Sequence, residues 1–127
     1  MIPDPPAAPP RIAVLADDLI WATRLADGVR AAGATPAPAR TMDGLAALLP
    51  EVDRVVVDLT ARSYDGVAAI AAASAAGRPV LAVGQHDDQE LRVRARAAGA
   101  DRVYAYRKLF EDGPATLRAW IAKESPP

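Results

Sequence analysis

Short apolar runs alternate with helix-forming stretches along most of the chain. The runs lie at residues 12–16, 35–39, 55–59, 80–83 and 102–106, and the run at 35–39 is the weakest. Runs of this length, bounded by turn residues, indicate strands rather than helices. Each run is followed by a stretch in which apolar residues recur at the spacing of a helix. The pattern therefore predicts five strands that alternate with five helices.

The helices can be outlined from their capping residues and their breakers. They are expected at residues 18–33, about 43–49, 66–76, about 87–99 and in a last stretch with Pro114 in its first turn. In the third helix, the side chains expected to face the sheet are those of Val67, Ile70, Ala71 and Ser74. A proline is tolerated in the first turn of a helix, where its missing N–H would have no partner. We therefore predict that the fifth helix begins close to Pro114.

Alternation of strands and helices in so short a chain favours parallel βαβ units with right-handed crossovers. The expected fold is a flavodoxin-like α/β three-layer sandwich, (βα)5, with a five-stranded parallel sheet in the order 2-1-3-4-5. In this order the first and third strands are adjacent and flank the point where the chain reverses direction across the sheet. Ligands of such sheets bind there, outside the carboxyl ends of the strands.

Three acidic residues fall at this point of the predicted sheet. Asp17 and Asp18 follow the first strand, and Asp58 ends the third. Three like charges crowded together require a cation, and carboxylate oxygens suit a hard divalent ion. The plainer alternative is helix capping by Asp17 or Asp18 and a turn role for Asp58. The third helix is preceded by Asp65 in a turn.

Composition narrows the function classes further. The chain has 127 residues, 51% of them hydrophobic, with 24% charged residues and a formal net charge of −1. One domain is expected, and nucleic-acid binding through bulk charge is not. There is no cysteine and one histidine, His86, which excludes thiolate sites and multi-histidine metal clusters within one chain. His86 is expected on an exposed loop, with a role at the site as the alternative.

The ends of the chain differ from its centre. Five prolines occur among residues 1–10, which predicts a flexible or polyproline-like leader. The single domain is expected at 11–124, with a disordered tail at 125–127. No apolar stretch approaches the length of a membrane span and no secretory signal precedes the domain, so we expect a cytoplasmic protein. No output domain is expected after the fifth helix.

Together these motifs resemble the receiver domain of two-component response regulators. The match includes the acidic pair Asp17 and Asp18, Asp58 followed by Leu59, and a glycine, Gly66, eight positions beyond Asp58. It continues through residues 78–83 as the fourth strand and 97–100 before the fifth, and it covers about residues 11–124. Each piece is weakly specific by itself, whereas their order and spacing together are fairly specific.

The resemblance implies a role for each residue at the site. Asp58 would be the phosphoacceptor, and Asp17, Asp18, Asp58 and the backbone carbonyl of Thr60 would hold Mg²⁺. A dication is needed because a carboxylate attacks a phosphoryl group poorly unless the phosphate charge is neutralised. No enzymatic activity is expected beyond self-phosphorylation and autodephosphorylation at Asp58. Trp21 would either shield the mouth of the site or pack inside.

Two positions depart from the receiver pattern. Gly84 stands where a serine or threonine would contact phosphate, which leaves only its backbone. The lysine of the fifth strand would fall at Tyr106, whereas Lys108 lies two residues late. Two placements remain open. In the first, a short loop insertion brings Lys108 or Arg107 to the phosphate. In the second, the site lacks its cation, and Tyr106 gates or blocks the site or takes the place of the cation.

A partner surface is predicted on the fourth helix, the fifth strand and the fifth helix. Arg92 and Arg96 share one helix face, and Val93 and Trp120 would add apolar contacts. The alternatives are a solvated face for the arginines and a core position for Trp120. In receivers this surface mediates docking or homodimerisation, so the resemblance implies a homodimer through it. Contact with nucleic acid or a membrane is not expected.

Two functions remain open at this stage. One is a stand-alone phosphorelay receiver with atypical switching, whose partners are a histidine kinase, a phosphotransfer protein or another regulator. The other is a phosphorylation-independent pseudo-receiver that acts as a protein interaction or scaffold module. A flavodoxin-like domain that binds a metal or a small molecule is a further class. It has no glycine-rich nucleotide loop after the first strand, where Asp17 and Asp18 stand.

Overall fold

The chain forms a five-stranded parallel sheet covered by helices. The structure, a computed structural model, describes residues 8–85 and 87–122, so His86, most of the leader and the tail lie outside the described residues. The elements are β1 (Arg11–Leu15), α1 (Leu19–Ala31), β2 (Thr35–Ala39), α2 (Met42–Leu48), a 3-10 turn η1 (Leu49–Glu51), β3 (Arg54–Asp58), α3 (Gly66–Ala75), β4 (Val80–Gly84), α4 (Gln89–Ala97), β5 (Arg102–Ala105) and α5 (Tyr106–Ala122). The strand order is β2-β1-β3-β4-β5. The predicted fold and strand order are confirmed.

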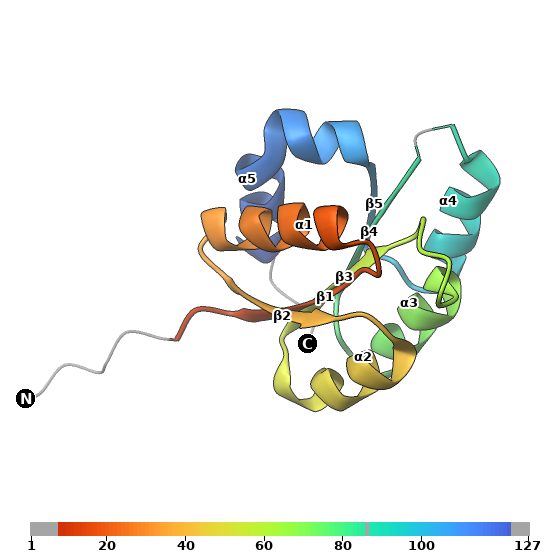
Figure 1. The fold of residues 1–127 in the computed structure, drawn as a ribbon, viewed down its shortest axis with the longest axis horizontal. Helices are drawn as coiled ribbons and strands as arrows, with labels where there is room; N and C mark the ends of the chain where they lie inside the picture. The colour runs from red at the N-terminus through yellow and green to blue at the C-terminus, as the bar shows by residue number, and fades with distance from the viewer. Residues whose placement is uncertain (1–7, 86, 123–127) are drawn as a thin grey trace, which may run out of the picture.

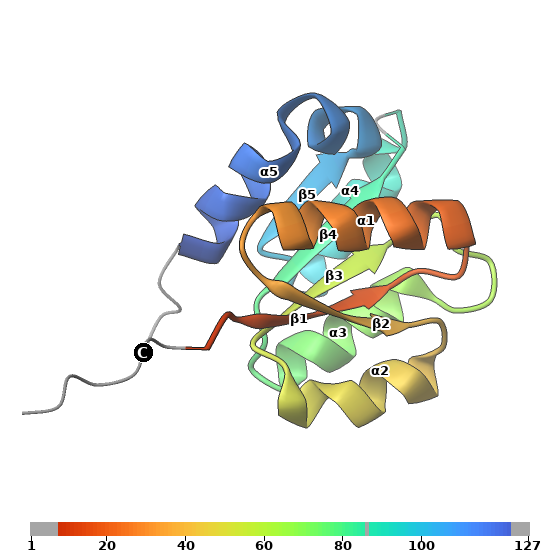
Figure 2. The ribbon, with the colours of Figure 1, turned by 60° about the vertical axis from the view of Figure 1, so that its left-hand side comes forward.

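Helices lie on both faces of the sheet. Helices α1 and α5 cover one face, and α2, α3 and α4 cover the other (Figures 1 and 2). Alternate residues of the central strands enter the two layers, so Val56 packs under α1 and α5 whereas Val55 and Val57 pack under the other helices. All five residues of β3 and of β4 are buried. Burial on both faces explains why these strands are continuous apolar runs.

The edge strand β2 contains two prolines. Pro36 and Pro38 are paired in register with Ile12 and Val14 of β1. The ladder runs through the residues between and beside them, because Thr35 N donates to Pro10 O at 2.8 Å and Ala39 O accepts from Ala16 N at 3.1 Å. In a parallel strand alternate residues direct their backbone groups to opposite sides. The prolines therefore lack N–H groups only on the open edge, where none is needed.

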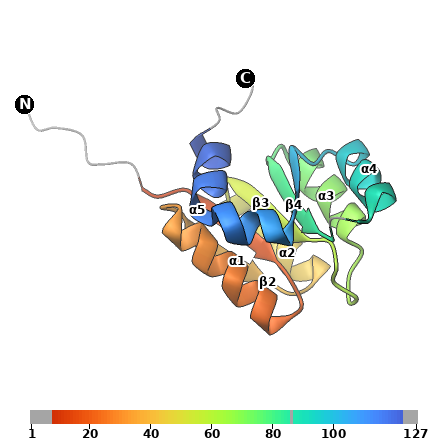
Figure 3. The ribbon, with the colours of Figure 1, turned by 90° about the horizontal axis from the view of Figure 1, so that it is seen from above.

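The start of the fifth helix differs from the prediction. The helix begins at Tyr106 rather than near Pro114, which lies inside it, and β5 ends at Ala105. Two pairs of side chains, four residues apart, support the early turns: Arg107 with Glu111 and Lys108 with Asp112. An internal proline removes a helical hydrogen bond and bends the axis. Helix α5 changes direction along its length (Figure 3).

The buried face of α3 also differs from the prediction. The structure buries Ala69, Ile70 and Ala73, so only Ile70 was assigned correctly. Alanine occurs on every side of this helix, so the pattern carried too little amphipathicity to define one face.

No helix within residues 8–85 and 87–122 is long and apolar enough to cross a bilayer.

Candidate functional site

The predicted acidic residues lie at the carboxyl ends of two neighbouring strands. Asp58 is the last residue of β3, and Asp17 and Asp18 follow β1, which pairs with β3 up to Leu15 and Val57. This placement was predicted from the strand order. The side chains, however, make different contacts from those expected.

The Asp58 carboxylate is buried, with 1% of the residue exposed. Its Oδ1 atom accepts hydrogen bonds from the backbone N–H of Thr60 at 2.9 Å and from the Thr60 hydroxyl at 2.8 Å. The Tyr106 hydroxyl donates a third hydrogen bond to the same atom, and it lies 2.7 Å from Thr60 Oγ1. Among the described residues, Oδ2 of Asp58 has no hydrogen-bond partner. Within the described residues, Oδ1 thus accepts three hydrogen bonds and Oδ2 accepts none.

Asp17 is turned toward the loop between β3 and α3. Its Oδ2 atom accepts from Arg62 N at 3.0 Å, from Ser63 N at 2.9 Å and from Ser63 Oγ at 2.8 Å. The backbone hydrogen bond from Ser63 is the largest of several contacts that lower the pKa of Asp17. This carboxylate therefore serves as an anchor for the loop.

Asp18 caps the first helix. Its Oδ1 atom accepts from Trp21 N at 3.0 Å, and its backbone has the extended conformation of an N-cap residue. Helix capping, the plainer of the two sequence interpretations, therefore describes Asp18.

The three carboxylates do not assemble into a metal site. In the part of the chain that the structure describes, no three acidic or histidine side chains come close enough together to hold a metal ion. The carboxylate of Asp17 binds a loop, that of Asp18 caps a helix, and that of Asp58 lies under Tyr106. In this arrangement the residues do not fit the Mg²⁺ ion that the family resemblance implied.

Tyr106 is itself covered by an aromatic stack. Its ring lies 4.0 Å from that of Trp21, which in turn lies 5.1 Å from that of Phe110. The Arg24 guanidinium lies over two of these rings, 5.5 Å from the centroid of Trp21 and 5.2 Å from that of Phe110. Burial, followed by the hydrogen bond to Asp58, raises the pKa of Tyr106, so its hydroxyl keeps its proton. Trp21 is half-buried, stacks on Tyr106 and lies at the edge of the site beside Asp17 and Asp18.

Neither basic residue predicted to contact phosphate lies at Asp58. Arg107 Nε pairs with Glu111 at 2.8 Å and Lys108 Nζ with Asp112 at 2.6 Å, on the solvent side of α5. The early start of α5 causes this, because helical geometry turns both side chains outward. Gly84 ends β4 as predicted, and a Cβ atom there would meet Leu59 Cβ at an ordinary 3.5 Å. Tyr106, rather than either basic residue, lies against the Asp58 carboxylate.

Tyr64 is a site residue that sequence analysis missed. Its buried hydroxyl lies 2.6 Å from the carbonyl oxygen of Asp58 and 2.9 Å from that of Leu15, so it joins β1 and β3. Burial, and then the charge of Asp58, raise its pKa. The available signal was a single aromatic residue in the loop between β3 and α3.

The predicted partner surface is only partly present. Val93 is 66% exposed and Arg96 is exposed, whereas Arg92 donates to the backbone oxygen of Val103 at 3.3 Å. Trp120 was wrongly placed on this surface, because it is 1% exposed and its Nε1 donates to Asp101 at 3.0 Å. Its position on the inner side of α5 puts it in the core. The surface therefore lacks its predicted aromatic anchor.

Comparison with known proteins identifies the fold. No protein-family profile and no curated protein sequence matches the chain. A two-component response regulator from Clostridium difficile superposes with a TM-score of 0.78 at 13% identity, over 90% of this chain and 97% of that one. The signal receiver domain of a DNA-binding response regulator from Colwellia psychrerythraea 34H gives 0.75 at 21% identity, over 89% and 98%.

A third similar structure holds a modified acidic residue. It is a response regulator protein from Burkholderia pseudomallei with a phosphorylated aspartic acid, calcium ion and citrate. Its TM-score is 0.70 at 21% identity, over 92% of this chain and 75% of that one. The fold of this chain is therefore that of response-regulator receiver domains.

Proposed function

We propose that this chain is a receiver-like protein interaction module that works without phosphorylation of Asp58. One observation carries the proposal: the Tyr106 hydroxyl donates a hydrogen bond to Asp58 Oδ1, the carboxylate of the expected phosphoacceptor. The pseudo-receiver alternative is thereby preferred to the phosphorelay receiver.

Phosphoryl transfer to a carboxylate requires an approach to a carboxylate oxygen and a dication beside it. Oδ1 of Asp58 already accepts three hydrogen bonds, and the residue is 1% exposed. Asp17 already holds the loop at Arg62 and Ser63 through its Oδ2 atom, so a metal ion would have to share this carboxylate with the loop. Asp58 and Asp17 are both engaged in contacts within the chain, so the arrangement disfavours the reaction.

Stabilisation of a bound phosphoryl group is also weak at this site. Gly84 brings no hydroxyl, and the cations of Arg107 and Lys108 are paired with carboxylates of their own helix. Each missing charge-assisted contact removes about 1.5–3 kcal/mol. A bound phosphoryl group shifts the equilibrium between two conformations only by the difference between its contact free energies in the two. Signalling through contact with a partner protein does not need these groups.

A phosphorelay receiver is the second candidate, with Asp58 as acceptor and Mg²⁺ held by Asp17, Asp18 and Asp58. The bare Oδ2 atom of Asp58 favours it, since buried polar atoms normally have partners. A hollow of about 360 Å³ lined by Asp17, Asp18 and Thr60 lies beside the site. In this candidate Tyr106 acts as a gate that must swing away first, and the partners are a histidine kinase or a phosphotransfer protein.

Intact-mass analysis separates the two candidates. The chain and its Asp58→Asn variant are incubated with acetyl phosphate and Mg²⁺, with folding verified by circular dichroism. The proposal expects no phosphoryl adduct on either protein. A single adduct on the parent that is absent from the variant would overturn the proposal and establish the phosphorelay receiver.

Tryptophan fluorescence gives a second readout of metal binding. Trp21 stacks on Tyr106 beside the site, whereas Trp120 is buried under the other half of α5. Millimolar Mg²⁺ is expected to leave the emission unchanged. Saturable quenching that disappears in Trp21→Phe but persists in Trp120→Phe would show that the ion binds beside Asp58, against the proposal.

A further inference from the structure

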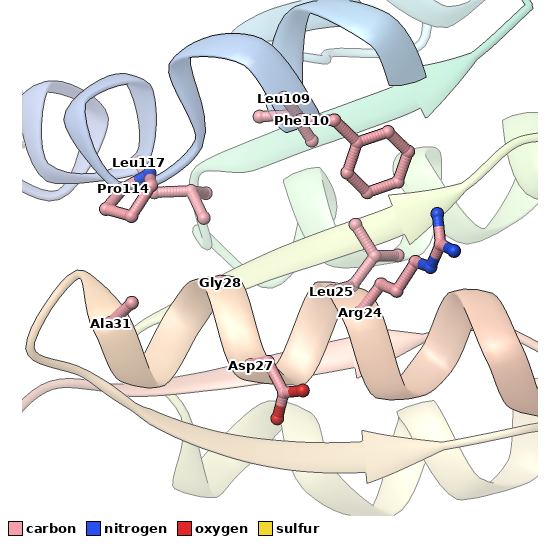
Figure 4. A pocket seen from close by; sticks show the side chains of 9 residues that line it. All are labelled: Arg24, Leu25, Asp27, Gly28, Ala31, Leu109, Phe110, Pro114 and Leu117. Carbon is pink, nitrogen blue, oxygen red and sulfur yellow. The ribbon is translucent and has the colours of Figure 1, made fainter.

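A groove between α1 and α5 lies next to the aromatic stack but outside the acidic site. Its volume is about 260 Å³, and its floor is apolar. The lining residues are Arg24, Leu25, Asp27, Gly28, Ala31, Leu109, Phe110, Pro114 and Leu117 (Figure 4). This space is close to that of one large side chain and below the usual size of a small-molecule pocket. The groove suits one anchoring side chain of a peptide.

The path of α5 forms this groove. At its narrow end the helices approach so closely that a Cβ atom on Gly28 would lie 3.1 Å from Leu117 Cδ1. Pro114 lies inside α5, where an internal proline bends a helix, and α5 changes direction along its length (Figure 3). Leu25, Leu109 and Leu117 are buried in the floor, whereas Phe110 remains 44% exposed at the rim. Ile20, one turn before Arg24 on α1, is a further exposed apolar residue, at 64%.

The charged residues around the groove differ in whether they form ion pairs. Carboxylates of the two helices are paired on their own helix: Asp27 with Arg30, Glu111 with Arg107 and Asp112 with Lys108. In the described part of α1 and α5, Arg24 and Arg118 are the basic residues that form no ion pair. Arg24 extends toward Phe110, whereas the Asp27 carboxylate points away from α5 (Figure 4).

These two cations stand near opposite ends of the groove. Arg24 lines it beside Phe110, and Arg118 donates to the backbone oxygen of Ala31 at 3.4 Å. An apolar groove with Arg24 in its lining and Arg118 beside Ala31, neither of them in an ion pair, complements an apolar side chain flanked by carboxylates. Aromatic and arginine residues are also the types that carry most of the energy in protein interfaces.

We propose that the α1–α5 groove is a docking site for a partner protein segment in which one large apolar side chain is flanked by acidic residues. The proposal rests on the interaction-module function, and it names the chemistry of the partner. The apolar side chain occupies the groove between Leu25 and Phe110, and carboxylates of the segment pair with Arg24 and Arg118.

Amide chemical-shift titration of the full chain tests this docking. The probe is a short terminally blocked peptide with one phenylalanine flanked by two glutamates on either side, and the matched peptide carries glutamines instead. The glutamate peptide is expected to shift amides of Arg24–Ala31 and Leu109–Leu117. The glutamine peptide should bind about fivefold more weakly, which corresponds to the loss of the two exposed charge pairs with Arg24 and Arg118.

Three variants locate the site. Arg24→Gln should reduce the fivefold preference for glutamate. Ala31→Met fills the groove from an exposed helical position and should abolish binding, whereas Ala68→Met, an exposed alanine of α3, should leave it unchanged. Equal binding of the two peptides, shifts elsewhere, or no shift at millimolar peptide would overturn the proposal.

Other occupants would give distinct results. Phenylbutyrate that binds as tightly as the glutamate peptide would assign the groove to a small acid, and shifts that grow with protein concentration alone would assign it to a second copy of this chain. Either result would overturn the proposal. A phosphoryl adduct on Asp58 together with normal peptide binding would instead remove only the proposed function of the acidic site.

Discussion

At the scale of single residues, the contacts of Asp58 explain how a carboxylate is kept in a core. A buried charge needs hydrogen-bond donors or a cation. Thr60 supplies two donors from the loop after β3, and Tyr106 supplies one from the start of α5. These donors do in part what a metal ion and a lysine would do, so the carboxylate remains ordered without either.

Asp17 should make stability depend on pH. Its pKa is lowered in the folded chain, so its contribution is complete above its unfolded pKa and is lost as pH falls through the folded value. We expect the free energy of unfolding to fall from about pH 5 toward about pH 2. Asp17→Asn should be less stable at neutral pH and show a shallower fall in urea denaturation across this range.

Asp27→Asn is the control for this prediction. The Asp27 carboxylate forms an exposed ion pair with Arg30, which contributes little to stability. The free energy of unfolding of Asp27→Asn should change with pH in the same way as that of the parent. If the profiles of parent and Asp17→Asn run parallel through the acid range, the loop anchor does not stabilise the fold in the way argued.

At the scale of elements, alanine and glycine allow helices to approach closely. Helix α3 is mostly alanine, and its Ser74 lies against Gly99, which follows α4. Gly99 has φ of +118°, a conformation that side chains rarely adopt, and a Cβ atom there would lie 2.7 Å from Ser74 Cβ. The α3–α4 contact therefore requires glycine for two independent reasons.

Gly99→Ala should destabilise the chain by about 2–4 kcal/mol, from backbone strain together with overpacking. Gly77→Ala is the matched control. Gly77 also has positive φ, +78°, but nothing lies within 4 Å of a Cβ atom there. Gly77→Ala should lower the free energy of unfolding by about 1–2 kcal/mol. Chemical denaturation measures both, and equal losses would show that the contact with Ser74 relaxes without cost.

At the scale of the whole molecule, the sheet has two edges to protect. Strand β5 closes one edge with four residues, and β2 forms the other. Proline at positions 36 and 38 removes N–H groups from the outer side of β2, so a second sheet finds few donors there. The same residues that weakened the strand pattern of this segment thus protect the sheet from pairing with another chain.

Replacing both prolines with valine should increase self-association. Pro36→Val together with Pro38→Val restores two donors on the open edge and adds β-branched side chains. Sedimentation velocity should show larger species as the concentration of this variant rises. Thr35→Val is the control, because the N–H of Thr35 is already bonded to Pro10. Association of the control alone, or of neither variant, would contradict the edge argument.

Most of the fold was determined by the sequence by itself. Apolar runs fixed in length by turn residues mark β1, β3 and β4, and helix-capping aspartates mark α1 and α3, because these signals act over a few residues. The strand order was expected from the flavodoxin-like arrangement, in which right-handed crossovers place helices on both faces of the sheet. Helix α5 was misjudged, since the pattern there carries a helix-starting signal at Pro114 and only weak pairwise support before it.

The candidate site could also be predicted only in part. That Asp17, Asp18 and Asp58 lie at one sheet edge could be predicted from the sequence, because strand order places the ends of β1 and β3 together. Which atoms those carboxylates contact depends on the tertiary structure. Tyr106 lies 48 residues from Asp58, and Ser63 lies 46 from Asp17. Such contacts depend on where α5 begins and how a loop turns, and no local periodicity records either.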